Sequence, residues 1–288
     1  MLTWGDRKNV DGTLYDISCD IHQQEDQMLL LDHGLTISNE NFSIVLSHQK
    51  PSRVIIAVPH DGLIANDFTG AFRTRTSGIM GRDAHVWPIA NDMVWVAARR
   101  GASVDAVRFL LPRAYADANR ALRGEPNTDP DTRGQIALED NRLITLYRHY
   151  RAQLCRLVER SIETFGREQV LFIDLHGFGR QPLKAPPGGY DLILGTAYRT
   201  TIPYGDVDLV LGTFAEERGY TVFIPNSSPS FLGGDPYSAG HTTRWFAQRY
   251  KINAIQVEIA HKFRLKENTE LGKKLALDIA EFFSRQYQ

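Results

Sequence analysis

Short, continuous apolar runs alternate with amphipathic stretches along most of the chain. Each run is bounded by polar or turn-forming residues, which is typical of a buried strand; the runs are residues 53–60, 170–176, 191–196, 220–225 and 253–261. Apolar residues at three- and four-residue spacing predict helices between them, at about 90–100, 136–165, 207–218, 240–250 and 269–286. Strands that alternate with helices predict a three-layer α/β/α sandwich around a mixed, largely parallel central sheet.

The composition is that of an ordinary globular protein, and we expect residues 1–288 to form a single catalytic domain. Hydrophobic residues make up 42% of the chain and charged residues 23%, and the net charge is −1. A chain with so little net charge and no dense basic run is not expected to bind nucleic acid or a membrane surface. No membrane span or signal peptide is predicted, and Cys19 and Cys155 are far apart. We therefore expect a cytoplasmic protein with reduced thiols, of unknown oligomeric state.

Two histidines stand at the ends of predicted strands. His60 ends the run in VIIAVPHDG, and His176 ends the run in VLFIDLHGFG. The carboxyl ends of parallel strands gather reactive groups at one edge of a sheet. Neutral imidazole is the commonest ligand of catalytic zinc, which usually takes three protein ligands and keeps one position for water. A lone histidine is more often structural, but two at equivalent strand ends predict a metal site.

The third ligand should be a carboxylate or a further histidine. We expect Asp92, at the start of a predicted helix, and its rivals are Asp61, Asp83 and His85. Asp174 lies two residues before the second histidine and thus on the same strand face. That position suits an acceptor that orients an imidazole, and a capping or ion-pair role is the alternative.

The segment LLPRAYADANRAL, residues 110–122, carries donors suited to a carboxylate. Arg113, Asn119 and Arg120 are such donors, and a guanidinium binds a carboxylate through two parallel hydrogen bonds. The alternative is a surface strand with salt bridges.

Glu258 lies in the middle of the apolar run AIQVEIAH. A carboxylate in a buried strand is costly unless it is paired or functional. Beside a metal-bound water it would serve as general base and then as general acid. The alternative is a structural partner for an arginine.

The tract at 225–246 is rich in Gly, Pro, Ser and Asn and is too long for a simple turn, so it is a candidate substrate-covering loop. His241 and Arg244 begin the helix that follows it, and we place both among the substrate-binding residues. The chain has no phosphate loop, GxGxxG fingerprint, GxSxG elbow or CxxC pair. Nucleotide, serine-hydrolase and thiol chemistry therefore lose support.

Taken together, these segments resemble the N-formylglutamate amidohydrolase family, which is related in fold to the zinc carboxypeptidases and aspartoacylases. The similarity rests on the order and spacing of several pieces between residue 53 and about residue 264: VPHDG, NDMV, PRAYADANR, FIDLHGFG, DLILGT, GGDPYSAGHTTR and IQVEIAHKFR. The resemblance implies a zinc-exopeptidase-like fold, with His60 and His176 as zinc ligands and Asp92 as the carboxylate ligand. It also implies that Glu258 activates water.

The resemblance further implies a carboxylate-binding pair in Asn119 and Arg120, which Arg113 could join.

Three departures from the family's sequence pattern flank the predicted metal pocket. The family usually has serine at the position of Asp61, a His-Ser-Met-Pro-like turn where this chain has HGFGR, and often a tyrosine near His241. The resemblance therefore supports the reaction class more strongly than N-formylglutamate as the substrate.

The sequence thus predicts a zinc-dependent hydrolase of a small amide that bears a free carboxylate, such as an N-formyl or N-acyl amino acid. Glu258 would take a proton from zinc-activated water and pass it to the departing nitrogen, and Arg113 or His241 would help to stabilise the oxyanion. Other divalent metals suit the same ligands. The alternatives are a zinc carboxypeptidase or peptidoglycan-directed amidase, a catalytically silent zinc- or ligand-binding homologue, and a metal-free structural protein.

Overall fold

A computed structural model describes residues 34–63, 70–132, 134–179, 181, 187–225 and 237–287. Cys19 and most of the predicted substrate-covering loop lie outside these residues. Cys155 is a half-buried free thiol.

The described residues form one eight-stranded sheet in the order β1-β2-β4-β3-β5-β8-β6-β7. The four central strands β4, β3, β5 and β8 are parallel, whereas β1 and β2 form an antiparallel edge and β6 runs antiparallel to β8. The sheet is therefore mixed and largely parallel, as predicted. The strands are β1 Leu35–Glu40, β2 Ser43–His48, β3 Val54–Val58, β4 Val104–Phe109, β5 Leu171–Phe178, β6 Leu192–Gly195, β7 Val222–Phe223 and β8 Asn253–Ala260.

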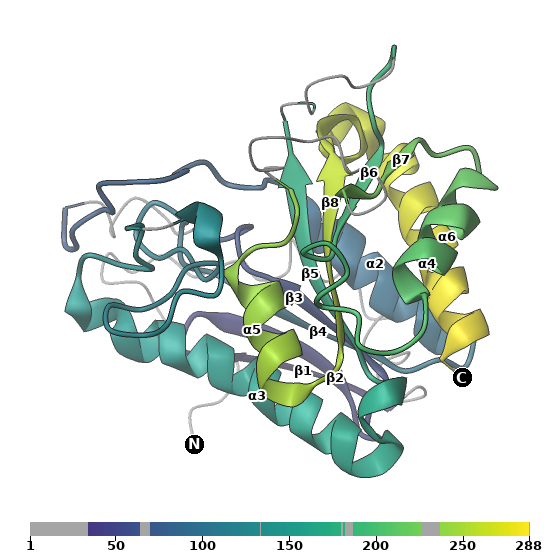
Figure 1. Ribbon diagram of the computed structural model, residues 1–288, viewed down its shortest axis with the longest axis horizontal. Coiled ribbons are helices and arrows are strands. Elements are labelled where there is room, and N and C mark those ends of the chain that lie inside the picture. Colours follow the sequence, from purple (N-terminus) through teal and green to yellow (C-terminus); the bar gives the residue numbers. More distant parts are fainter. Residues whose placement is uncertain are drawn as a thin grey trace, which may run out of the picture.

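Helices cover both faces of the sheet, which confirms the three-layer architecture. In Figure 1, α3 and α5 lie on one side of the sheet and α2, α4 and α6 on the other. Within the described residues, no helix is both long and apolar enough to cross a membrane. The helices are α2 Val86–Arg99, α3 Ile144–Phe165, α4 Val207–Glu216, α5 His241–Tyr250 and α6 Thr269–Gln286.

Two hydrophobic cores fill the spaces between these layers. Along β3, Ile56 packs in the core under α2, α4 and α6, whereas Ile55 packs in the core under α3 and α5. In the second core, Phe172 of β5 stacks on Phe246 of α5 with ring centroids 4.1 Å apart. Because both faces of the central strands are covered, their sequences are continuously apolar rather than alternating.

Strand β4 is missing from the predicted elements because it carries two charged residues, Asp105 and Arg108. The Asp105 carboxylate is fully buried and accepts hydrogen bonds from the backbone N–H of His48 (2.8 Å), Ser52 Oγ (2.7 Å) and Arg160 Nη2 (3.1 Å). Partners from distant segments thus make a buried charge acceptable in a central strand.

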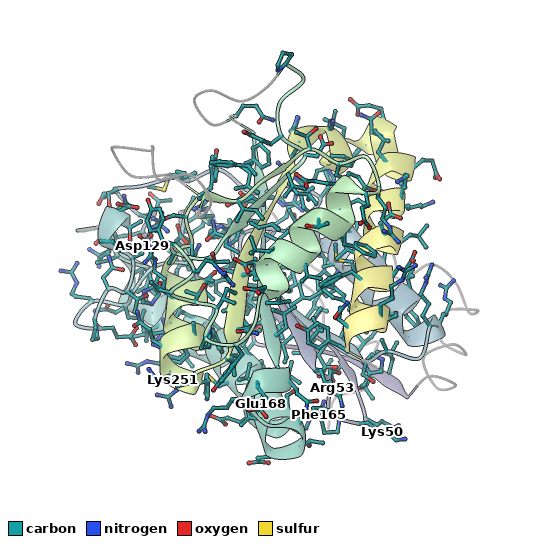
Figure 2. All side chains as sticks on the ribbon, turned by 45° about the vertical axis from the view of Figure 1, so that its right-hand side comes forward. Lys50, Arg53, Asp129, Phe165, Glu168 and Lys251 are labelled. Carbon is teal, nitrogen blue, oxygen red and sulfur yellow. The ribbon has the colours of Figure 1, made fainter. Side chains whose placement is uncertain are left out.

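The amino-terminal end of the sheet is fixed to the end of α3. The guanidinium of Arg53, just before β3, lies over the ring of Phe165 at 4.7 Å from its centroid. Figure 2 shows both residues at one end of the molecule, together with Lys50 and Glu168. The opposite, carboxyl edge of the parallel strands carries His60 and the end of β5 with His176.

Candidate metal centre

Three adjacent parallel strands, β3, β5 and β8, bring the predicted site residues to the carboxyl edge of the sheet. His60 follows β3 by two residues, and His176 lies near the end of β5. Glu258 on β8 is paired in register with His176 on β5. All three side chains are buried. Sequence-distant residues meet here because parallel strands end at the same edge.

Asp83 completes a group of three possible metal ligands with the two histidines. Asp83 Oδ2 lies 3.3 Å from Nδ1 of His60 and 3.2 Å from Nδ1 of His176. The three candidate ligand atoms lie within 4.8 Å of one another, and all three residues are buried. The imidazole rings are tilted by 60° with centroids 4.7 Å apart. The three donors therefore converge on one point.

The structure favours Asp83 over the predicted Asp92 as the third ligand. Asp92 lies on α2 outside this group, because the helix begins at Val86 rather than near residue 90 and places Asp92 beyond its first turn. Asp83, one of its rivals, lies in the segment before the helix, where its backbone N–H donates to the carbonyl of His60 over 3.0 Å. That hydrogen bond fixes the carboxylate beside the first histidine.

The second nitrogen of each imidazole faces another buried carboxylate. His60 Nε2 lies 2.6 Å from Asp117 Oδ1, and His176 Nε2 lies 3.1 Å from Asp174 Oδ1. Asp174 therefore lies where an acceptor that orients the imidazole would be. The hydrogen bond between His60 Nε2 and Asp117 fixes the tautomer of this imidazole and directs the lone pair of its Nδ1 toward a metal.

These residues could hold a metal ion, and their chemistry suits zinc. Zinc bonds of about 2.0–2.1 Å in a tetrahedral arrangement separate neighbouring ligand atoms by roughly 3.3–3.4 Å. The two distances from Asp83 Oδ2 to the imidazoles, 3.3 and 3.2 Å, are close to that separation. The donor set of two imidazoles and one carboxylate is also a known catalytic zinc set with one position left for water.

The charged forms of Asp83 and His176 stabilise each other, whereas burial disfavours the ionised form of Glu258. Burial opposes ionisation of Asp83, but hydrogen bonds from His176 and His60 hold the pKa of its carboxyl well below the usual range. Burial likewise opposes the charged form of His176, but Asp174 and Asp83 hold its pKa well above the usual range. Burial raises the pKa of Glu258 to about 7. A general base with a pKa near neutrality is suited to proton transfer at physiological pH.

The predicted carboxylate-binding residues surround the ligand group in a buried segment, not in a surface strand. Arg113 Nη1 lies 3.6 Å from Asp83 Oδ1, and its Nε donates to Asp117 Oδ2 over 3.1 Å. Asn119 Nδ2 lies 3.4 Å from Nε2 of His176. Arg120 is buried next to Asn119 and donates to its carbonyl over 2.7 Å.

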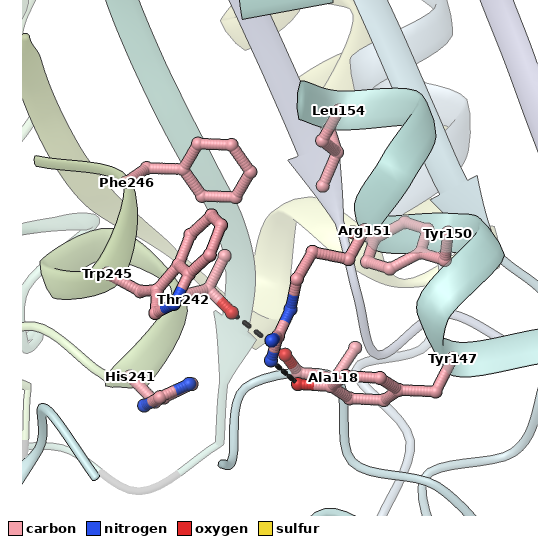
Figure 3. A pocket seen from close by; sticks show the side chains of 9 residues that line it. All are labelled: Ala118, Tyr147, Tyr150, Arg151, Leu154, His241, Thr242, Trp245 and Phe246. Atoms are coloured by element: carbon pink, nitrogen blue, oxygen red, sulfur yellow. Dashed lines mark hydrogen bonds between the residues drawn. The ribbon is translucent and has the colours of Figure 1, made fainter. Parts of the chain in front are cut away.

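The other two predicted substrate-binding residues lie in the first turn of α5. His241 is buried, and its Nδ1 is 2.9 Å from Thr128 Oγ1. Burial, together with the nearby Arg151, lowers the pKa of His241 to about 4, so its imidazole is neutral at pH 7. Figure 3 shows it beside a small pocket lined by α3, α5 and Ala118. Arg244 donates to the carbonyl of Ala239 over 2.9 Å. Among the described residues, neither side chain hydrogen-bonds to the three ligands.

One buried arginine joins β5, β8 and the segment before α2 through their backbones. Arg264 donates to the carbonyls of Ala84 (2.8 Å), Phe178 (3.0 Å) and Ile259 (3.2 Å). These carbonyls lie one residue after Asp83, two residues after His176 and one residue after Glu258. The guanidinium packs against Gly177, where an added Cβ would lie 2.3 Å from its Cζ. Glycine after His176 therefore provides space for this contact.

Asp61, at a position where the family usually has serine, supports the start of α2. Its carboxylate is fully buried and accepts hydrogen bonds from the backbone N–H groups of Trp87 (2.7 Å) and His85 (3.2 Å). It also pairs with Arg82 at 2.6 Å. Asp61 thus satisfies N–H groups that the first turn of a helix leaves without a partner.

Replacing Asp61 with alanine is expected to lower the free energy of unfolding by about 1–3 kcal/mol, because the substitution leaves buried N–H donors unpaired. Urea denaturation in the presence of a chelator measures this without a contribution from metal binding. The exposed Asp131 is the control, since Asp131→Ala should change stability by less than about 0.5 kcal/mol. Equal effects of the two substitutions would contradict the capping role.

Sequence reasoning missed two residues that contact the site, Asp117 and Gln256. Asp117 lies within the segment examined for its arginines and asparagine, two residues before Asn119. Gln256 lies two residues before Glu258, so the alternation of a strand places both on one face. That alternation is the sequence signal by which Gln256 could be found. Asp117 reaches His60 through the path of its loop, and the sequence does not reveal that path.

Comparisons with known proteins agree with this architecture. A crystal structure of an N-formylglutamate amidohydrolase from Ralstonia eutropha JMP134 is similar, with a TM-score of 0.59 and 20% identity over 88% of this chain and 99% of the other. A gene product from Agrobacterium tumefaciens has a TM-score of 0.54 and 14% identity over 89% of this chain and 95% of the other. Comparison with curated proteins finds no match.

These structural similarities support the fold alone, because the sequence identities are low. The sequence itself matches the model of the N-formylglutamate amidohydrolase family over residues 52–264. The matched region contains all three possible ligands, Glu258 and the buried segment with Arg113. The chain therefore belongs to the N-formylglutamate amidohydrolase family of enzymes.

Proposed function

We propose that this protein is a zinc-dependent hydrolase that cleaves the amide bond of a small carboxylate-bearing substrate, such as an N-formyl or N-acyl amino acid. The observation that carries the proposal is the convergence of His60, Asp83 and His176 beside Glu258 at the carboxyl edge of the sheet. When bound there, zinc supplies Lewis-acid chemistry, in that it makes water more acidic and polarises a carbonyl oxygen.

Glu258 is the proton carrier in this proposal. It lies opposite His176 in the sheet register, and burial raises its pKa to about 7. A carboxylate in this position accepts a proton from the attacking water and delivers it to the amide nitrogen as the carbon–nitrogen bond breaks. Arg113, beside Asp83, is the candidate donor to the carbonyl oxygen as negative charge develops there.

The substrate carboxylate is assigned to the buried segment that carries Asn119 and Arg120. The contact of Asn119 with His176 brings this segment against the ligand group. A guanidinium held in place by the protein binds a carboxylate with fixed geometry. Binding the carboxylate there would orient the amide of a short substrate toward the metal, which lowers the entropic part of the barrier.

The first test is the metal content of the purified protein together with its hydrolytic activity. We expect one zinc ion per chain, loss of hydrolysis after chelation, and recovery when zinc is restored. The substrates are N-formyl and N-acetyl amino acids, their carboxamide analogues, and short peptides. A site that pairs with a carboxylate is expected to discriminate against the uncharged carboxamides by about 10–100-fold in kcat/KM.

The outcomes separate the proposal from its rivals. Chelator-sensitive hydrolysis that prefers peptides would indicate a carboxypeptidase or a peptidoglycan-directed amidase. Bound zinc without hydrolysis of any of these amides would favour a silent zinc-binding homologue. A protein that binds no divalent metal would refute the metal site proposed here.

A further inference from the structure

Gln256 is a buried residue that contacts Glu258 and has no role in the proposed function. The two residues are two positions apart on β8, so both side chains project from the same face of the sheet. Gln256 Nε2 donates a hydrogen bond to Glu258 Oε1 over 3.0 Å, and the two side chains are 5% and 7% exposed. Within the described residues, no other hydrogen bond reaches this carboxylate.

The orientation of the Gln256 amide follows from its second partner. Its Oε1 accepts a hydrogen bond from the backbone N–H of Gly240 over 2.6 Å. A backbone N–H can only donate, so the amide oxygen must face Gly240 and the NH₂ group must face Glu258. The amide therefore presents a donor to the carboxylate.

Gly240 is itself held in place by the start of α5. The backbone N–H of Thr242 donates to Asn119 Oδ1 over 2.8 Å, and Thr243 Oγ1 donates to Asp174 Oδ2 over 3.0 Å. A Cβ on Gly240 would lie 2.3 Å from Asn119 Nδ2, so a side chain there would displace this contact. None of these contacts involves Gln256, which makes Gly240 a fixed point independent of it.

We propose that Gln256 is a positioning residue that holds the Glu258 carboxylate in its reactive orientation. This inference rests on the proposed role of Glu258 as the proton carrier. A glutamate side chain has several rotatable bonds, and ordering it costs conformational entropy. The hydrogen bond to Oε1 fixes the plane of the carboxylate and leaves Oε2 for the reacting water. Gln256 acts only through Glu258 and does not touch the substrate.

The kinetic test compares Gln256→Met with Gln153→Met. Methionine has nearly the length of glutamine but cannot form these hydrogen bonds. Gln256→Met is expected to lower kcat by about 10–100-fold, as is typical when the partner of a functional group is removed. KM should change by less than about twofold, and zinc content should stay the same. Gln153 is the matched control, because it is a buried glutamine on α3 bonded to His149, and its replacement should leave kcat unchanged.

A double variant separates positioning from a structural effect. If Gln256 acts only through Glu258, then adding Gln256→Met to Glu258→Gln should lower the residual rate by less than about threefold. If Gln256→Met lowered the rate by the same factor with and without Glu258→Gln, the inference would be overturned. A kcat of Gln256→Met alone within about threefold of the wild type would overturn it as well.

Crystal structures of the wild type and Gln256→Met test the inference without any need for activity. We expect the Glu258 carboxylate to leave its position or lose its order in the variant, while His60, Asp83 and His176 stay in place. An unchanged Glu258 would overturn the positioning role whether or not the protein hydrolyses amides. A wild-type protein that binds no metal and hydrolyses none of these amides would refute the proposed function. The two crystal structures would still show whether Gln256 holds the Glu258 carboxylate in place.

Discussion

Replacing Glu258 with glutamine is expected to lower kcat by about 10²–10⁴-fold, the range that a positioned general base contributes. Glutamine has the same shape but cannot accept a proton from water at neutral pH. Glu258 is not among the three possible metal ligands, so the variant should still bind one zinc ion per chain. A loss confined to turnover would therefore identify a proton carrier rather than a ligand.

The measurement combines steady-state kinetics on the preferred substrate with metal analysis of the same samples. Glu270→Gln is a suitable control, because the Glu270 side chain is 88% exposed on α6 and pairs with the exposed Lys273. A rate close to that of the wild type in Glu258→Gln would refute the proposed role. Loss of zinc together with activity would instead place Glu258 among the ligands.

Replacing Asp83 with asparagine should remove most of the bound zinc and, with it, hydrolysis. An amide is a much weaker ligand than a carboxylate, and Asp83 provides the anionic donor between two imidazoles. The loss of zinc affinity should exceed the ~10–100-fold that follows removal of a residue that only supports a ligand. Competition with a fluorescent zinc chelator measures that affinity directly.

Asp92→Asn is the decisive comparison, because sequence patterns favour Asp92 and the structure favours Asp83. We expect Asp92→Asn to keep both zinc and activity, since Asp92 lies on α2 outside the ligand group. The reverse result, with zinc lost in Asp92→Asn and retained in Asp83→Asn, would make Asp92 the third ligand.

The fold was largely predictable because the central strands are covered on both faces. Covered strands are continuously apolar, and β3, β5 and β8 stand out in the sequence for that reason. The edge strands β1 and β2 do not stand out in the sequence, since short strands with many polar residues lack a continuous apolar run. The sequence pattern predicts a start of α3 at residue 136, but the helix begins at Ile144. Before it, Leu138 forms an isolated bridge with Ala116, and a short 3-10 helix follows, where Asp140 accepts a hydrogen bond from the backbone N–H of Arg142 over 3.1 Å.

The site was predictable in part, to the extent that it lies on strands. His60, His176 and Glu258 were found because the ends of parallel strands share one edge. The third ligand was not fixed by this rule, because Asp83 and its rivals belong to turns and a helix start. Tertiary contacts such as the hydrogen bond from the Asp83 backbone to His60 determine which of them reaches the histidines.

The contact of Arg264 with backbone carbonyls has a consequence for the divergence of this enzyme. Every residue has a carbonyl, so the side chains at Ala84, Phe178 and Ile259 can change without loss of the hydrogen bonds that hold their segments together. Substitutions there are therefore limited by packing, since Phe178 and Ile259 are buried core residues, and not by the loss of these hydrogen bonds. Directed evolution of substrate preference should accordingly leave Arg264 unchanged.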